Sequence, residues 1–120
     1  MISKKEIYAI IGASKNPEKY GYKVLINLKE SGFKVTPVNP KEEEIQGLKV
    51  YERLADIEKV DVVVFVVPPS ITEKVLEEVK ELGIRSVWMQ PGSESEQAIK
   101  FCEENNINCV HHACIMMNHD

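Results

Sequence analysis

Short apolar runs alternate with amphipathic segments along most of the chain. Ile7 to Ile11 and Val62 to Val67 are almost continuously apolar, which predicts strands buried on both faces, as in the middle of a parallel sheet. Tyr20 to Ser31 carries its small and apolar residues on one helical face, and Gly32 follows as a helix stop. The chain therefore begins with a strand, a helix and a turn.

The same alternation continues to the carboxyl end. Further strands are expected at Val35–Val38, at Val50 with Tyr51, at Val87–Met89 and from Cys109 onward. Further helices are expected around Leu54 to Ile57 and after two capping boxes, Ser70 with Glu73 and Ser93 with Glu96. We therefore predict an α/β fold, a three-layer, Rossmann-like, doubly wound parallel sheet with strand order 3-2-1-4-5-6, in a single domain over residues 1–120.

In this strand order the winding reverses between the first and fourth strands, and ligands bind in the crevice at that point. The loop Gly12–Pro17 follows the first strand, and Pro68–Ser70 follows the fourth. The loop from Gly12 leads into a helix, whose free amide groups attract anions such as a pyrophosphate. It lacks the dinucleotide fingerprint, because Ser14 and Pro17 stand where the second and third glycines would be.

The end of the second strand reads Asn39-Pro40-Lys41, where nicotinamide enzymes place an acidic residue for the ribose. A neutral residue followed by a cation fits a ribose bearing a phosphate, either the 3′-phosphate of coenzyme A or the 2′-phosphate of NADP. The alternative is a plain turn with a solvated lysine. Pro68 and Pro69 form a stiff apolar wall that suits an adenine or a pantetheine arm, or they simply end a buried strand.

Composition and charge exclude some classes of function. Hydrophobic residues make up 43% of the 120 residues and charged residues 28%, which suits one globular core. The net charge of −4 argues against nucleic-acid binding. The longest apolar stretch is too short for a bilayer, and the amino terminus lacks a secretory signal, so we expect no membrane partner and a cytoplasmic location. No metal is expected, because the spacing of the late residues does not match a zinc module, the residues being His111, His112, Cys114 and His119.

Several of these segments occur together, in order, in a known family. They are Gly12 to Pro17, Pro37 to Lys41, Val66 to Pro69, Trp88 to Gly92 and the late Cys114. Over nearly its whole length the chain resembles the stand-alone CoA-binding domain proteins, which are related to the amino-terminal domain of the succinyl-CoA synthetase alpha subunit. The ordered set is far more specific than any one segment.

The resemblance implies that the CoA pyrophosphate lies at the loop from Gly12, that the adenosine end lies near Asn39, and that a glycine-containing turn at Gln90 lies beside the ligand. It also implies an acidic residue two positions before the late cysteine, where this chain has His112. The expected ligand-binding residues are Gly12, Ala13, Ser14, Lys15, Asn16, Asn39, Pro40, Lys41, Val67, Pro68, Pro69, Gln90 and Gly92.

The hypothesis favoured by the sequence is therefore a non-catalytic protein that binds coenzyme A or acyl-CoA. Two alternatives stay open, an NADP-linked oxidoreductase and a subunit of a larger acyl-CoA ligase. Cys114 is either an inert, buried cysteine, the favoured interpretation, or a partner for the CoA thiol in a mixed disulfide. Met116 and Met117 leave a homodimer open without defining its interface.

Overall fold

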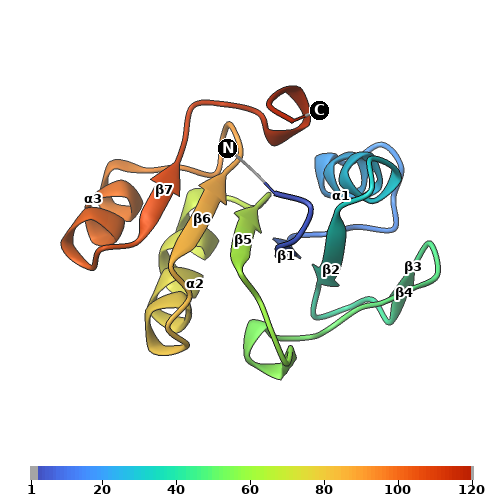
Figure 1. Cartoon of the computed structure of the whole chain (residues 1–120), viewed down its shortest axis with the longest axis horizontal. Coiled ribbons are helices and arrows are strands. Elements are labelled where there is room, and N and C mark those ends of the chain that lie inside the picture. The colour runs from blue at the N-terminus through green and yellow to red at the C-terminus, as the bar shows by residue number, and fades with distance from the viewer. Residues whose placement is uncertain (1–2, 120) are drawn as a thin grey trace.

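The computed structural model describes residues 3–119 and contains a parallel sheet of five strands in the order β2-β1-β5-β6-β7 (Figure 1). Every neighbouring pair in this sheet is parallel. The strands are β1 (Ile7–Ile11), β2 (Lys34–Val38), β5 (Val62–Phe65), β6 (Ser86–Met89) and β7 (Asn108–Val110). The winding reverses between β1 and β5, so the predicted Rossmann-like α/β fold is confirmed.

Helices cover both faces of this sheet, as three layers require. Helix α1 (Tyr20–Glu30) lies on one face, and α2 (Pro69–Glu81) and α3 (Glu96–Glu104) lie on the other (Figure 1). Each helix follows a strand and leads back to the next, which is the right-handed crossover expected between parallel strands. A short 3-10 helix, Ile115–Met117, returns to the side of α1.

The central strand β5 shows why the core divides into two parts. Val62 and Val64 belong to the apolar cluster on the side of α1, whereas Val63 and Phe65 belong to the cluster under α2 and α3. All four side chains are buried, as the near-continuous apolar run predicts. Strand β5 ends two residues earlier than predicted, and the backbone continues beside β1 only through the bond from Val66 N to Ile11 O, 2.9 Å long.

The expected third strand is largely absent, and the predicted order of six strands is wrong in that respect. The residues just before Val50 form a hairpin of β3 (Glu44–Ile45) and β4 (Leu48–Lys49). Only Tyr51 pairs with the sheet, through a parallel bridge to Val38 in which Tyr51 N donates to Pro37 O at 3.0 Å. The short 3-10 helix Leu54–Asp56 then takes the place of the predicted helix.

Both capping boxes predicted from Ser-x-x-Glu spacing are wrong. Helix α2 begins at Pro69, one residue before Ser70, because a proline fixes φ near the value that the first helical position requires; Pro68 is the N-cap. Helix α3 is capped by Ser95, whose hydroxyl accepts a hydrogen bond from Ala98 N at 3.0 Å. Ser93 has another role, since its hydroxyl accepts from Val67 N at 3.0 Å.

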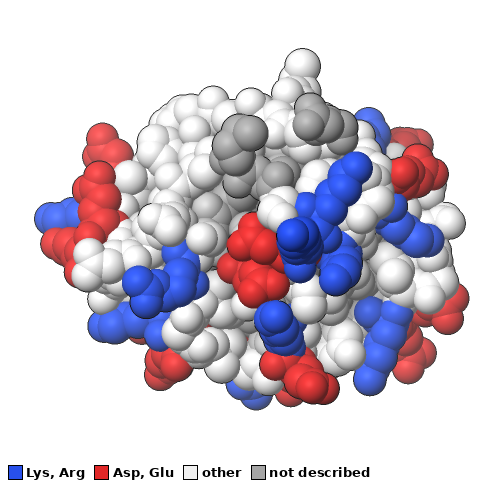
Figure 2. All heavy atoms as spheres, viewed as in Figure 1, with Lys and Arg blue, Asp and Glu red and all other residues white. Residues whose placement is uncertain are grey.

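Charged side chains of both signs are spread over the face of the molecule seen in Figure 2. A helix long and apolar enough to cross a bilayer is not found among residues 3–119. Since the chain as a whole carries a net charge of −4, a local surplus of positive charge has to be sought in particular cavities.

Candidate functional site

The carboxyl ends of β1 and β5 lie side by side, and Gly12 brings their loops into contact. Its φ is +96°, and a Cβ placed on it would lie 2.3 Å from Val66 O and 2.7 Å from Val67 Cγ1. A side chain at this position would therefore collide with the β5 backbone as well as strain its own. Residue 12 must be glycine if the two loops are to meet.

Gly21, in the first turn of α1, is a second close contact that the sequence interpretation missed. A Cβ on Gly21 would lie 1.9 Å from Gly12 O, so α1 packs directly on the loop that precedes it. Close packing of helix on strand is the role of the third glycine in the dinucleotide fingerprint. The loop is longer here, so Gly21 lies beyond the spacing of the fingerprint. The signal that could have revealed this contact is a glycine at the second position of a predicted helix.

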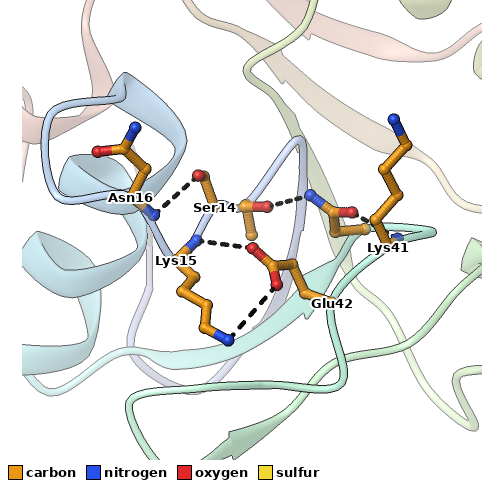
Figure 3. A network of polar contacts seen from close by, with 7 residues as sticks. Ser14, Lys15, Asn16, Lys41 and Glu42 are labelled. Atoms are coloured by element: carbon orange, nitrogen blue, oxygen red, sulfur yellow. Dashed lines mark hydrogen bonds and ion pairs between the residues drawn. The ribbon is translucent and has the colours of Figure 1, made fainter.

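Asn39, at the end of β2, ties the neighbouring loop to the loop from Gly12. Its amide Nδ2 donates to Ala13 O at 2.8 Å, and its Oδ1 accepts from Lys41 N at 2.7 Å. Figure 3 shows these bonds together with the contact between Lys15 and Glu42. Asn39 is therefore a structural link between two loops, a role the sequence interpretation did not assign to it.

A cavity of about 620 Å³ opens between these loops and α2. Its charged lining consists of four cationic and two acidic side chains, although the whole chain carries net negative charge. These residues are Lys19, Lys41, Arg53, Lys74, Glu52 and Glu78. The cavity, called here the cationic cavity, can attract a phosphate group over the short range at which exposed charges act in salt.

The cationic cavity also has an apolar wall. Val67 follows β5, Ile71 and Val75 lie on α2, and Leu54 begins the short helix after the hairpin. Ile71 is 41% exposed, which is unusual for a large aliphatic side chain and leaves it available to cover a flat ring. An aromatic heterocycle beside a phosphate would find both of its contacts in this cavity.

A second cavity of about 300 Å³ lies beyond Val67, at the carboxyl ends of β5 and β6. No charged side chain is among its lining residues in the described part of the chain, and it is called here the neutral cavity. The residues are Tyr20, Val66, Val67, Pro68, Gln90, Pro91, Gly92, Ser93 and Cys114. Val67 lines both cavities, so the two share a wall at the point where the winding reverses.

Gln90 organises the floor of the neutral cavity. Its Oε1 accepts from the buried Ile115 N at 2.8 Å, and its Nε2 donates to Cys114 Sγ at 3.3 Å. The carboxyl-terminal segment is held a second time by Trp88, whose Nε1 donates to Ala113 O at 2.8 Å. These bonds bring Cys114 to the cavity, and Trp88 itself packs in the core.

The predicted ligand-binding residues therefore divide into four groups. Gly12, Asn39, Pro40 and Lys41 line the cationic cavity; Pro68, Gln90 and Gly92 line the neutral cavity; and Val67 lines both. The loop residues Ala13 to Asn16 line neither cavity, and Pro69 is the first residue of α2. Sequence interpretation missed the cations from distant segments, Lys19, Arg53 and Lys74, as well as Tyr20 and Ser93.

The shifted pKa values belong to groups away from the cavities. Burial raises the pKa of Tyr8, whose hydroxyl donates to Ser3 O at 2.9 Å. The pKa of the Cys102 thiol is raised by the hydrogen bond it shares with the Cys109 side chain and by burial, and the same bond lowers the pKa of Cys109. Tyr8, Cys102 and Cys109 line neither the cationic cavity nor the neutral cavity.

The fold and the loops at the reversal of winding define a Rossmann-like α/β domain. Within that class, the chain belongs to the CoA binding domain family, which matches residues 6–120. The predicted family is thereby confirmed.

Known proteins extend this result. Over 85 residues the chain is 45% identical to an ADP-forming acetate–CoA ligase of Methanocaldococcus jannaschii, a match covering 70% of the chain and 12% of the ligase. A solved conserved hypothetical protein from Pyrococcus furiosus is 43% identical, with a TM-score of 0.91, over 95% of the chain and 99% of that protein. A dinucleotide-forming acetyl-coenzyme A synthetase of Ca. Korarchaeum cryptofilum, solved with phosphate and ADP, is 29% identical, with a TM-score of 0.78, over 88% of the chain and 25% of the synthetase. The chain thus resembles one part of these longer enzymes and nearly all of the shorter protein.

Proposed function

We propose that the chain binds coenzyme A or acyl-CoA across both cavities. The adenosine and its 3′-phosphate would occupy the cationic cavity, the pyrophosphate would lie at the loop from Gly12, and the pantetheine arm would reach the neutral cavity. The observation that carries the proposal is the shared wall at Val67, which joins a phosphate-attracting cavity to one without charged side chains. Membership of the CoA binding domain family supports the same ligand.

We further propose that binding, and not catalysis, is what this chain contributes. Acyl transfer to or from a thiol needs a group that removes or supplies a proton. Among the described residues that line the neutral cavity, none is a carboxylate or a histidine. The thiol end of the ligand would therefore be held without a carboxylate or a histidine beside it.

A role as the CoA-binding part of an ADP-forming acyl-CoA ligase is the second candidate. It is supported by the 45% identity to the Methanocaldococcus jannaschii ligase, and the matched region makes up 12% of the length of that ligase. Under this hypothesis the remaining reaction steps would belong to other protein segments, and this chain would present the ligand thiol at the mouth of the neutral cavity.

Calorimetric titration of the purified chain with CoA, dephospho-CoA, NADP and NAD tests the binding proposal. CoA is expected to bind more tightly than dephospho-CoA, because only CoA carries the 3′-phosphate. Lys41→Ala should weaken CoA binding by about tenfold, the effect of losing one hydrogen bond to a charged group, and should alter dephospho-CoA binding much less.

Lys100→Ala is the matched control, since Lys100 is an exposed lysine on α3 that lines neither cavity. Equal losses of affinity for CoA and for dephospho-CoA in Lys41→Ala would show that Lys41 does not contact the 3′-phosphate. Binding of NADP without binding of CoA would replace the proposal with the oxidoreductase alternative.

A further inference from the structure

Three backbone amides in and just after the loop from Gly12 donate to side-chain oxygen atoms of the chain itself. Asn16 N donates to Ser14 Oγ at 3.0 Å, and Glu18 N donates to Asn16 Oδ1 at 3.0 Å. Lys15 N donates to Glu42 Oε2 at 3.4 Å (Figure 3). An anion that contacts any of these three amides must replace its acceptor.

Glu42 differs from the other acceptors because it is charged and comes from the segment after β2. Its second oxygen, Oε1, lies 4.0 Å from Lys15 Nζ, so the two carboxylate oxygens face the amide and the ammonium of the same residue. Its side chain is only 23% exposed, whereas that of Lys15 is 70% exposed. The carboxylate thus takes the position at Lys15 that one oxygen pair of a phosphate would take.

Both contacts of Glu42 are long, and long contacts are easily exchanged. A charge-assisted N–H···O bond is ordinarily about 2.7–2.9 Å long, and an ion pair between exposed side chains contributes little. By contrast, Asn39 joins the same two segments through neutral groups, since its Nδ2 donates to Ala13 O at 2.8 Å. Release of Glu42 would therefore leave the two loops joined.

We infer that Glu42 is a built-in competitor for the phosphate groups of the ligand, an inference that rests on the proposed function. In the free protein its carboxylate neutralises Lys15. When a pyrophosphate binds at the loop, repulsion between like charges displaces the carboxylate, and Lys15 pairs with the ligand.

The test compares Glu42→Gln with Glu43→Gln in the full chain. Both substitutions remove one negative charge from adjacent positions, but the Glu43 side chain is exposed and takes no part in the network of Figure 3. Glu42→Gln should tighten CoA binding about threefold relative to Glu43→Gln, an effect of the size expected for one exposed charge contact. Glu42→Ala, which also removes the competing oxygen, should tighten it at least as much.

Two results would overturn the inference. Equal affinities in the Glu42→Gln and Glu43→Gln proteins would mean that only net charge matters. Weaker binding in Glu42→Gln would mean that the carboxylate holds the loops in the binding conformation and does not compete with the ligand.

The inference can also be separated from the proposed function by titrating inorganic pyrophosphate and following the Lys15 amide by NMR. Pyrophosphate should shift this amide at a lower concentration in Glu42→Gln than in the unmodified chain and in Glu43→Gln. Failure of CoA to bind the unmodified chain would refute the proposed function alone. An identical pyrophosphate response in all three proteins would refute the inference that Glu42 competes with the ligand.

Discussion

The cationic cavity and the neutral cavity share Val67, but the other residues that line them differ in kind. The larger is lined by Lys19, Lys41, Arg53 and Lys74, which come from four separate segments, and by two acids. The smaller has no charged lining residue in the described chain, and its residues Gln90 and Ser93 accept hydrogen bonds from the backbone amides of Ile115 and Val67. A ligand that spans them must be charged at one end and uncharged at the other.

This difference also separates two kinds of energetic contribution. Exposed cations act at short range and are screened by salt, whereas the bonds of Gln90 lie inside the protein, where an unpaired polar group is costly. Removing an exposed cation from the cationic cavity should therefore alter affinity, and removing the hydrogen bonds of Gln90 should alter the stability of the fold.

The largest expected effect comes from one glycine in each region. Gly12 and Gly92 have nearly the same φ, +96° and +97°, but a Cβ on Gly12 meets Val66 O at 2.3 Å and one on Gly92 meets nothing within 4 Å. Gly12→Ala should lower the free energy of unfolding by about 3 kcal/mol or more, because backbone strain and a collision add together. Gly92→Ala should lower it by about 1–2 kcal/mol, from strain alone.

Denaturant unfolding measures both variants, and CoA titration of the folded fraction completes the comparison. Gly12→Ala should also abolish measurable CoA binding, whereas Gly92→Ala should retain binding of adenosine 3′,5′-bisphosphate. Similar unfolding energies for the two variants would show that the loops at β1 and β5 can separate without cost.

A smaller effect is expected for Gln90→Leu, which removes the hydrogen bonds of a residue that lines the neutral cavity. The substitution leaves the buried Ile115 N without its acceptor, at a cost of about 1–3 kcal/mol in the free energy of unfolding. Gln97→Leu, on the exposed surface of α3, is the control and should change it by less than about 0.5 kcal/mol. Affinity for adenosine 3′,5′-bisphosphate should stay the same in Gln90→Leu, and a marked loss would show that the two cavities are energetically coupled.

The smallest effect is a change in the rate of cysteine alkylation. Cys114 is partly exposed in the neutral cavity, whereas Cys102 is fully buried and its pKa is raised by its hydrogen bond to Cys109 and by burial. Iodoacetamide should therefore modify Cys114 and leave Cys102 intact, since the thiolate is the reactive form. CoA should slow the modification of Cys114 a few-fold.

Peptide mass spectrometry measures this rate at each cysteine. Adenosine 3′,5′-bisphosphate should leave the rate at Cys114 unchanged, because it lacks the arm that reaches the neutral cavity. Equal protection by both compounds would place the nucleotide, and not the arm, beside Cys114.

Much of the fold could be predicted because it depends on local pattern. The apolar run at Val62 and the strand at Ile7 define the central strands, and their adjacent carboxyl ends locate the loops of the site. The starts of α2 and α3 were mispredicted because a Ser-x-x-Glu spacing fits positions inside the first turn as well as the cap, and Pro68 and Ser95 are the N-caps instead. Spacing alone does not distinguish these cases.

The charge of the cationic cavity could not be predicted in the same way. Lys41 lies on the loop that sequence reasoning indicated, but Arg53 and Lys74 reach the cavity from the short helix after the hairpin and from α2. Their convergence depends on how distant segments pack. The partner of Lys15, Glu42, is likewise visible only once the two loops are placed together.

The bridge between Val38 and Tyr51 bears on how the protein behaves when concentrated. Strand β2 is an edge of the sheet, and an open edge can recruit strands of other molecules into aggregates. Here Tyr51 occupies the backbone groups at the end of that edge, and Pro37 has no amide hydrogen to offer an incoming strand. The other edge, β7, is only three residues long. The sheet is thus protected at both margins against growing into a larger assembly.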